Sequence, residues 1–162
     1  MGQFATGVAV VSAAGRGPAV GMTINSLASL SLEPPLISLA VGHASNTWPQ
    51  IRQQPGFSIN ILSSQQQALC RAFATPSGRR FSDVDWTLSE HGTPIISGVL
   101  AWLHCEIEHE YAVGDHWLVA SRVIAARNNS SASGLIFFRS GFRTVGPLLT
   151  EGADGTRHAS GD

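Results

Sequence analysis

Neutral polar side chains gather in residues 21–36, which read GMTINSLASLSLEPPL. The first charged residue of this segment is Glu33. Before it, five hydroxyl or amide side chains lie within nine residues: Thr23, Asn25, Ser26, Ser29 and Ser31. Such side chains donate and accept hydrogen bonds without carrying a charge. We therefore expect this segment to suit a flat, uncharged ring system with a polar edge.

A second polar group precedes a predicted helix. Ser45, Asn46 and Thr47 come directly before a segment in which Pro49 is tolerated in the first helical turn. Unpaired backbone N–H groups and the helix dipole favour an anion at such a position. Helix capping is the simpler interpretation of this motif taken alone, and a phosphate site is the alternative.

One histidine lies where it could act in chemistry. His116 follows the turn in GDHW, at the start of a predicted strand, and its charge changes near neutral pH. Beside a cofactor it could donate a hydrogen bond or carry a proton. By contrast, residues 104–109 (HCEIEH) place their possible metal ligands on opposite faces of a strand, so no metal site is expected.

Composition limits the class of protein. The 162 residues fit one domain, and 43% hydrophobic content is enough for a core. Only 13% of residues are charged, which favours an oligomer whose surface is partly covered, with a compact monomer as the alternative. A net charge of −1 without a basic cluster excludes an electrostatic nucleic-acid site. The absence of a long apolar run or a secretory leader predicts no membrane span and a cytoplasmic location.

The elements that must position these residues are mostly strands. Hydrophobic patterns predict strands at residues 4–14, 19–24, 36–42, 56–62, 99–111, 116–127 and 133–145. Helices are predicted from residue 45 or 46 and over residues 64–74, and residues 75–92 are predicted to form a long loop. Many short strands with two interrupting helices favour an antiparallel barrel.

These segments together resemble a known family. FATGVAVVSA, GMTINSLASLSLEPPL, SNTWPQIR, GFSINIL, LAWLHCEIEHEYAVGDHWLVASRV and FFRSGFRTV, which occur in this order from residue 4 to 145, resemble the flavin reductase-like family of FMN-binding split barrels. The resemblance implies a mainly β fold, a six-stranded antiparallel Greek-key barrel with a few short helices, over residues 1–146. It leaves residues 147–162 as a disordered tail, and it implies a homodimer with flavin near the subunit interface.

The resemblance also implies the residues that bind flavin. The ring and ribityl chain would be contacted by Thr23, Ile24, Asn25 and Ser26, with Ser38, Leu39 and Ala40 lining the ring from the next strand. The phosphate would be held by Ser45, Asn46 and Thr47, and the nucleotide covered by Arg79 or Arg80 with Phe81. The family often carries Arg where this chain has Asn46, so we expect loose flavin binding.

The implied activity is NAD(P)H:flavin oxidoreduction. A hydride would pass from NADH or NADPH to N5 of FMN, or of FAD, and the reduced flavin would diffuse to a partner monooxygenase. His116 would be the catalytic residue, positioning the nicotinamide or supplying a proton, with Phe142 and Arg143 bordering the same pocket. The alternatives are a non-catalytic flavin- or haem-binding split barrel and an oxidase of the pyridoxamine-phosphate type.

Overall fold

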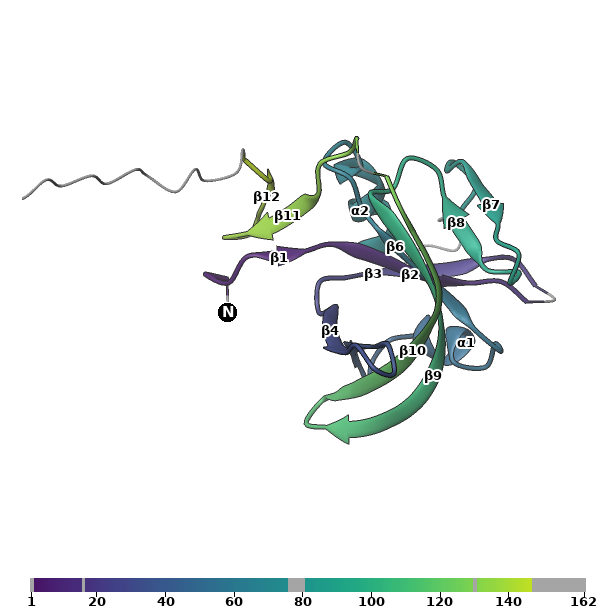
Figure 1. Cartoon of the computed structure of the whole chain (residues 1–162). Helices are drawn as coiled ribbons and strands as arrows, with labels where there is room; N and C mark the ends of the chain where they lie inside the picture. Colours follow the sequence, from purple (N-terminus) through teal and green to yellow (C-terminus); the bar gives the residue numbers. More distant parts are fainter. Residues whose placement is uncertain (1, 16, 76–80, 130, 147–162) are drawn as a thin grey trace, which may run out of the picture.

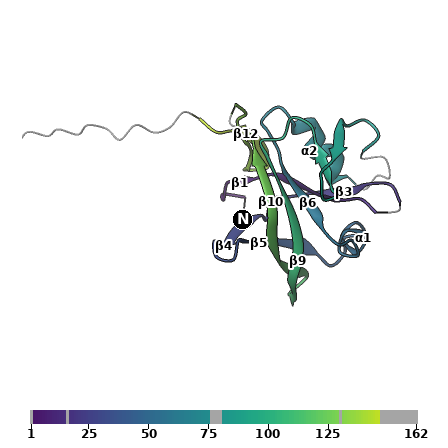
Figure 2. The ribbon, with the colours of Figure 1, turned by 45° about the vertical axis from the view of Figure 1, so that its right-hand side comes forward.

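A computed structural model describes residues 2–15, 17–75, 81–129 and 131–146. Its largest element is a seven-stranded antiparallel sheet (Figure 1). The strands follow the order β3 (Val20–Ile24), β2 (Ala9–Ala13), β6 (Phe57–Ile61), β9 (Ala101–Val113), β10 (His116–Asn128), β5 (Leu36–Gly42) and β4 (Ala28–Ser31). The long β9–β10 hairpin curves, so that β4 and β5 lie below β3 (Figures 1 and 2).

Two small sheets and two helices make up the rest of the regular structure among the described residues. β1 (Thr6–Gly7), β11 (Leu135–Phe138) and β12 (Gly141–Thr144) form one sheet, and β7 (Trp86–Leu88) pairs with β8 (Pro94–Ile96). The helices are α1 (Trp48–Ile51) and α2 (Gln67–Ala74). None of the helices in the described part of the chain is long and apolar enough to cross a membrane.

Two apolar clusters hold the elements together. The first lies inside the curved sheet and is formed by side chains that alternate along the strands, such as Ile37, Leu39 and Val41 of β5. The second packs α2 against the start of the chain and the small sheet, with Phe73 and Leu135 at its centre. Because side chains alternate along a strand, β5 places one face in the core and turns its other face away from the core.

The mainly β antiparallel fold that we predicted is confirmed, and four local predictions need correction. The main sheet has seven strands because residues 28–31 add an edge strand to β5. The first predicted strand divides at Val8 into β1 and β2, which join different sheets. The predicted loop over residues 75–92 contains β7, which pairs with β8 in a local antiparallel hairpin. The predicted tail, residues 147–162, lies outside the described residues.

The fourth correction concerns residues 133–145, which form a hairpin and not one strand. β11 and β12 pair across a turn in which Arg139 (φ 50°) and Ser140 (φ 59°) both adopt left-handed backbone. Two such residues match the twist of a tight hairpin, a position usually taken by Asn and Gly. Because Arg-Ser is not a typical turn pair, the sequence pattern did not indicate the turn.

A bulge in the β9–β10 hairpin redirects the end of β9. Ile107 pairs with Ser121 and His109 pairs with Ala120, so Glu108 is an extra residue on β9. The alternation expected for this strand therefore changes, and Glu110 turns toward the core. There its carboxylate accepts a hydrogen bond from the indole of Trp48 (2.8 Å) and forms an ion pair with Arg52 (2.9 Å).

Candidate functional site

A hollow of about 310 Å³ lies where the curved sheet is split, between the end of β3 and β5. β3 is the edge strand of the main sheet, and its outer edge faces this opening. An edge strand presents backbone N–H and C=O groups that its own sheet does not pair. The hollow is lined by Met22, Thr23, Ile24, Asn25, Ser26, Ala40, Val41, Gly42, Ser45 and His116.

The outward face of β5 forms a floor of small residues. Ser38, Ala40 and Gly42 alternate with core residues along the strand and therefore point away from the core. Ala40 and Gly42 line the hollow, while Ser38 lies beyond it. Leu39 has 0% exposure and packs in the core, so its side chain does not line the hollow. A floor without large side chains allows a flat ring to approach the backbone closely.

Two hydroxyl groups of the polar segment are used by the fold itself. Ser26 joins the end of β3 to β5, because its Oγ donates to the Ala40 carbonyl (2.9 Å) and accepts from the Ala40 N–H (3.0 Å). The Thr23 hydroxyl donates to the Cys70 carbonyl of α2 (2.8 Å). Asn25 is exposed at the rim. The segment therefore fixes the edges of the hollow as well as lining it.

The predicted phosphate corner is only partly assembled in the hollow. Ser45 lines it, and the Ser45 Oγ accepts the backbone N–H of Trp48 (3.2 Å) and contacts Sδ of Met22 (3.4 Å). Asn46 and Thr47 follow in the chain but do not line the hollow. Because α1 has four residues, a single turn, its dipole contributes little, and the nearby hydroxyl and N–H groups are the main donors.

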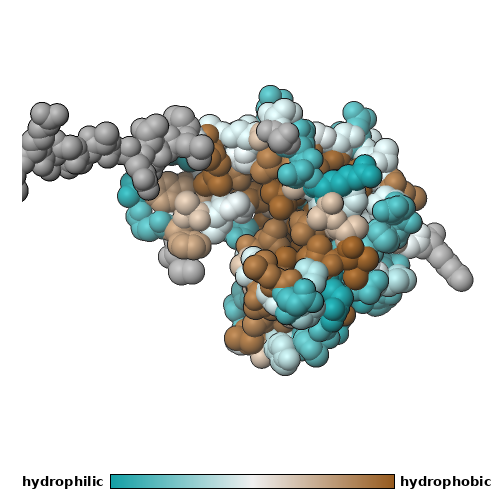
Figure 3. All heavy atoms as spheres, viewed as in Figure 1, coloured by the Kyte–Doolittle hydropathy of each residue, from teal (hydrophilic) through white to brown (hydrophobic). Residues whose placement is uncertain are grey.

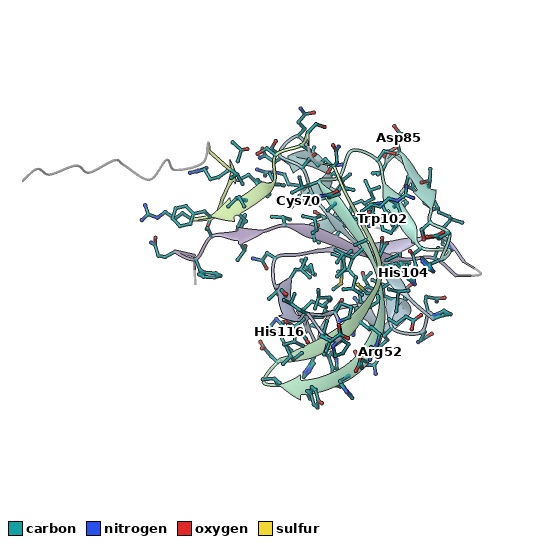
Figure 4. All side chains as sticks on the ribbon, in the orientation of Figure 1. Arg52, Cys70, Asp85, Trp102, His104 and His116 are labelled. Atoms are coloured by element: carbon teal, nitrogen blue, oxygen red, sulfur yellow. The ribbon has the colours of Figure 1, made fainter. Side chains whose placement is uncertain are left out.

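His116 borders the hollow opposite β3. Its Nδ1 lies 2.6 Å from Oδ1 of Asp115, and the residue pairs with Gly42 of β5 (Figure 4). The hydrogen bond from His116 lowers the pKa of the exposed Asp115 carboxyl. With Nδ1 bonded to this carboxylate, Nε2 is left to face a ligand.

A second hollow of about 280 Å³ lies on the other side of the β3 end. Its lining residues come from β3, α2, β11 and β12, from the β1–β2 junction and from the β3–β4 connection: Val8, Thr23, Ile24, Asn25, Cys70, Arg71, Ala74, Phe137 and Phe142. Phe142 therefore does not share a pocket with His116, although the two hollows share Thr23, Ile24 and Asn25.

Arg143, predicted beside Phe142, and Phe81, predicted to cover the nucleotide, do not line either hollow. The Arg143 guanidinium donates to the backbone carbonyl of Phe142 and does not line either hollow. Phe81 packs edge-on against Phe73 and Trp86 in the second apolar cluster. The predicted Arg79 or Arg80 contact lies outside the described residues.

Arg71 is a site residue that sequence reasoning missed. It occupies the exposed face of α2, which was predicted as a helix, but the helix pattern alone did not show that this face borders a hollow. Its guanidinium carbon lies 5.4 Å from the centroid of the Phe142 ring, a cation–π contact. The sequence offered one signal: Arg71 is the single charged residue in the otherwise mostly apolar segment QALCRAFA.

Of the possible metal ligands in residues 104–109, His104 and Cys105 are buried, whereas Glu106 and His109 are exposed. His104, 4% exposed, stacks on His91 with ring centroids 4.3 Å apart, and its Nδ1 lies 3.3 Å from the Thr93 hydroxyl. Burial lowers the pKa of His104, with a smaller contribution from the nearby His91. Burial also raises the pKa of the Cys105 thiol to about 12, which keeps it protonated.

Known proteins share both the sequence and the fold. Residues 1–146 match the family model described as "Flavin reductase like domain". A flavin reductase of Pseudomonas putida is 38% identical over 143 residues, covering 88% of this chain and 84% of the relative. The reductase subunit HsaB of a flavin-dependent monooxygenase from Rhodococcus jostii is 35% identical over 93% of this chain and 77% of its own length.

Solved structures of flavin reductases share the fold of this chain. The NADH:FAD oxidoreductase SgcE6 of Streptomyces globisporus superposes with a TM-score of 0.84 at 37% identity, covering 90% of this chain and 89% of that one. The flavin reductase PheA2 superposes with a TM-score of 0.82 at 31% identity, covering 90% of this chain and 94% of that one. The family-model match and the identity to curated relatives agree with the fold: this chain belongs to the flavin reductase-like family.

Proposed function

We propose that this protein is an NAD(P)H-dependent flavin reductase that transfers a hydride to FMN or FAD and releases the reduced flavin to a partner monooxygenase. The observation that carries the proposal is the hollow at the split of the sheet, with its small-residue floor, its edge-strand wall and His116. Relatives named as an NADH-dependent FMN reductase and an NADH-dependent FAD reductase support both flavins as acceptors.

The shape and polarity of the hollow fit a flavin ring. Ala40 and Gly42 provide a flat floor, and the β3 edge supplies neutral hydrogen-bonding groups to the polar rim of the ring. When bound, the flavin supplies the hydride-accepting chemistry. The protein's contribution is to hold the ring and the nicotinamide in contact, a proximity effect worth roughly 7–11 kcal/mol in well-oriented systems.

The same hollow is suited to release of its flavin. Among the described residues that line it there is no Lys or Arg, and Ser45 is the phosphate-side donor. With Asn46 and Thr47 completing the phosphate corner, the contacts to phosphate are neutral hydrogen bonds, which are weaker than charge-assisted ones. Loose binding is useful to an enzyme whose product must leave and reach a second protein.

His116 borders the hollow and is proposed to position the nicotinamide or to protonate the reduced ring. The carboxylate of Asp115 holds Nδ1, which fixes the orientation of the imidazole and leaves Nε2 toward the ligand. Hydride transfer itself needs no protein acid or base, so His116 assists a reaction that contact between the two rings makes possible.

The protein is further proposed to be a cytoplasmic homodimer. The outer face of the β9–β10 hairpin carries exposed apolar side chains, among them Tyr111, Val113, Leu118 and Ile124. Hydrophobic residues, drawn in brown, lie beside hydrophilic ones over the lower part of the molecule in Figure 3. A second copy covering this face, close to His116, would remove the apolar surface from water.

Stopped-flow reduction tests the proposed function directly. The purified protein is mixed with FMN, FAD or riboflavin and then with NADH or NADPH, and the loss of visible flavin absorbance is followed. We expect rapid bleaching with at least one flavin and one nicotinamide. Flavin or haem binding without bleaching by either nicotinamide would instead support the non-catalytic split barrel.

A further inference from the structure

The hollow around Arg71 is chemically unlike the hollow around His116. It contains one guanidinium and two aromatic rings, since Phe137 and Phe142 pack edge-on with centroids 5.6 Å apart. Arg71 lies on the Phe142 ring, is exposed, and forms no ion pair with any carboxylate in the described part of the chain. Its charge is therefore free to meet an anion.

Aromatic walls beside an unpaired guanidinium suit an aromatic base linked to a phosphate. Arg offers several N–H donors in a planar fork, which matches phosphate oxygens and stacks on rings. Val8 and Ala74 add apolar surface without bulk on either side. An adenosine phosphate combines a flat base with an anion and is the common chemistry of FAD and of the nicotinamide dinucleotides.

The arrangement of the two hollows decides which nucleotide supplies the adenosine phosphate. They share Thr23, Ile24 and Asn25, so they form one groove across the end of β3. Cys70, which lines the second hollow, and His116, which lines the first, lie above and below the β2–β3 ribbon (Figure 4). Ser45 lines only the first hollow, so the tail of a flavin whose phosphate lies there runs away from Arg71.

We propose that the second hollow binds the adenosine-phosphate half of the nicotinamide dinucleotide, with Arg71 contacting a phosphate. The inference rests on the proposed function, since it requires a flavin ring over β5 and a nicotinamide beside His116. It adds a binding site for the hydride donor that the His116 hollow alone does not supply, and it assigns Phe142 to the adenosine end of the donor.

Arg71→Gln tests the proposal with two hydride donors. Reduced nicotinamide mononucleotide carries the reactive ring but has no adenosine phosphate. With FMN as acceptor, we expect Arg71→Gln to raise the KM for NADH about five- to tenfold, the range for loss of one charge-assisted contact. The KM for reduced nicotinamide mononucleotide and the KM for FMN should stay unchanged.

Three further variants serve as controls. Arg127→Gln removes another exposed guanidinium, at the far end of β10, and should leave every KM unchanged. Arg71→Lys keeps the charge and should recover part of the NADH affinity. Ala74→Glu places a carboxylate in the hollow and should raise the KM for NADH alone; it tests the site even if Arg71→Gln is poorly folded by thermal melting.

The outcomes separate this inference from the proposed function. If Arg71→Gln and Ala74→Glu leave the KM for NADH unchanged, or raise it equally for both donors, the adenosine assignment is wrong. A raised KM for FAD, with those for FMN and NADH unchanged, would assign the hollow to the adenylate of the flavin and overturn the proposal. If the wild-type protein reduces no flavin with any donor, the proposed function itself fails.

Discussion

Two regions of this barrel use the same neutral side chains for opposite purposes. Under β8, on the face of β2 and β6 opposite the first apolar cluster, Ser12, Ser58 and Asn60 are all fully buried. At the split, Thr23, Asn25 and Ser26 border an open hollow. Both groups lie on or next to strands of the main sheet, and both are free of charge, so residue type does not distinguish them.

The covered group forms hydrogen bonds within itself and to β8. The Asn60 carbonyl accepts the Ile96 N–H (2.9 Å), and its amide donates to the Pro94 carbonyl (3.2 Å) and to the Ser12 hydroxyl (3.0 Å). Ser58 and Ser12 donate to the same Pro94 carbonyl. These bonds fasten β8 to the barrel and satisfy groups that are costly to bury alone.

At the split, the protein itself uses only part of the hydrogen-bonding capacity of the polar groups. The hydroxyls of Ser26 and Thr23 bond to β5 and α2, and no other strand among the described residues pairs with the outer edge of β3. The difference teaches that a polar cluster becomes a candidate site where the fold leaves it uncovered. Five substitutions break or sharpen this comparison.

Asn60→Leu should have the largest effect, on stability. Leu cannot accept the Ile96 N–H or donate to the Pro94 carbonyl, so buried polar groups lose their partners. We expect a loss of about 3 kcal/mol in the free energy of unfolding, measured by urea denaturation. Asn25→Ala at the split should cost less than about 0.5 kcal/mol. Equal costs at the two positions would contradict the distinction.

Ala40→Leu should weaken flavin binding and leave stability almost unchanged. A larger side chain on the floor of the first hollow occupies the space proposed for the ring. We expect the KM for FMN to rise at least about tenfold, equivalent to about 1.4 kcal/mol, with little change in unfolding free energy. Ala126→Leu, exposed at the far end of β10, is the matched control. An unchanged KM would show that the ring does not lie on β5.

His116→Ala separates positioning from acid–base catalysis at the split. A positioning role predicts turnover with NADH lower by about tenfold and nearly intact flavin binding, whereas general acid–base catalysis contributes about 10²–10⁴-fold. Steady-state kinetics and a flavin titration measure both quantities. His109→Ala, on the exposed part of β9, should behave like wild type, and an equally unaffected His116→Ala would remove the proposed role.

Ser26→Ala tests a residue that lines the hollow and also links its two edges. Removing the hydroxyl breaks two hydrogen bonds to Ala40 across the split. We expect a loss of about 1 kcal/mol in unfolding free energy, with a two- to threefold increase in the KM for FMN as the edges separate. Ser29→Ala, exposed on β4, should change neither quantity. A wild-type unfolding curve for Ser26→Ala would show that the split needs no such link.

His104→Gln tests the covered region through pH. Because burial lowers the pKa of His104, the folded protein binds fewer protons than the unfolded chain, and this contribution to stability falls as pH drops below the ordinary value of 6.5. Glu106 opposes the shift, and His91, with Glu90 beside it, contributes to it. Between pH 7 and 5 we expect the free energy of unfolding, measured by urea denaturation, to fall by up to about 1 kcal/mol per pH unit. This decrease should be smaller in His104→Gln than in His109→Gln.

Much of the first hollow was predictable because it is built from consecutive residues. Thr23, Asn25 and Ser26 are adjacent on one segment, and His116 and Ser45 follow turns with clear local signals. The alternation along residues 36–42 also predicts that Leu39 and Ala40 face opposite ways, although both were named as ring contacts. Phe81 and Arg143 were placed by resemblance alone, and their side chains pack elsewhere.

The sequence by itself determined the strands with strong alternation, both helices and the neutral character of the polar segment, since these depend on neighbouring residues and on turn chemistry. Tertiary structure alone decided three features: which polar groups are covered, where the Glu108 bulge turns Glu110 inward, and that Arg71 meets Phe142 beside β3. Each of these depends on pairing between residues far apart in the chain, and the energy of such contacts leaves no periodic trace in the local sequence.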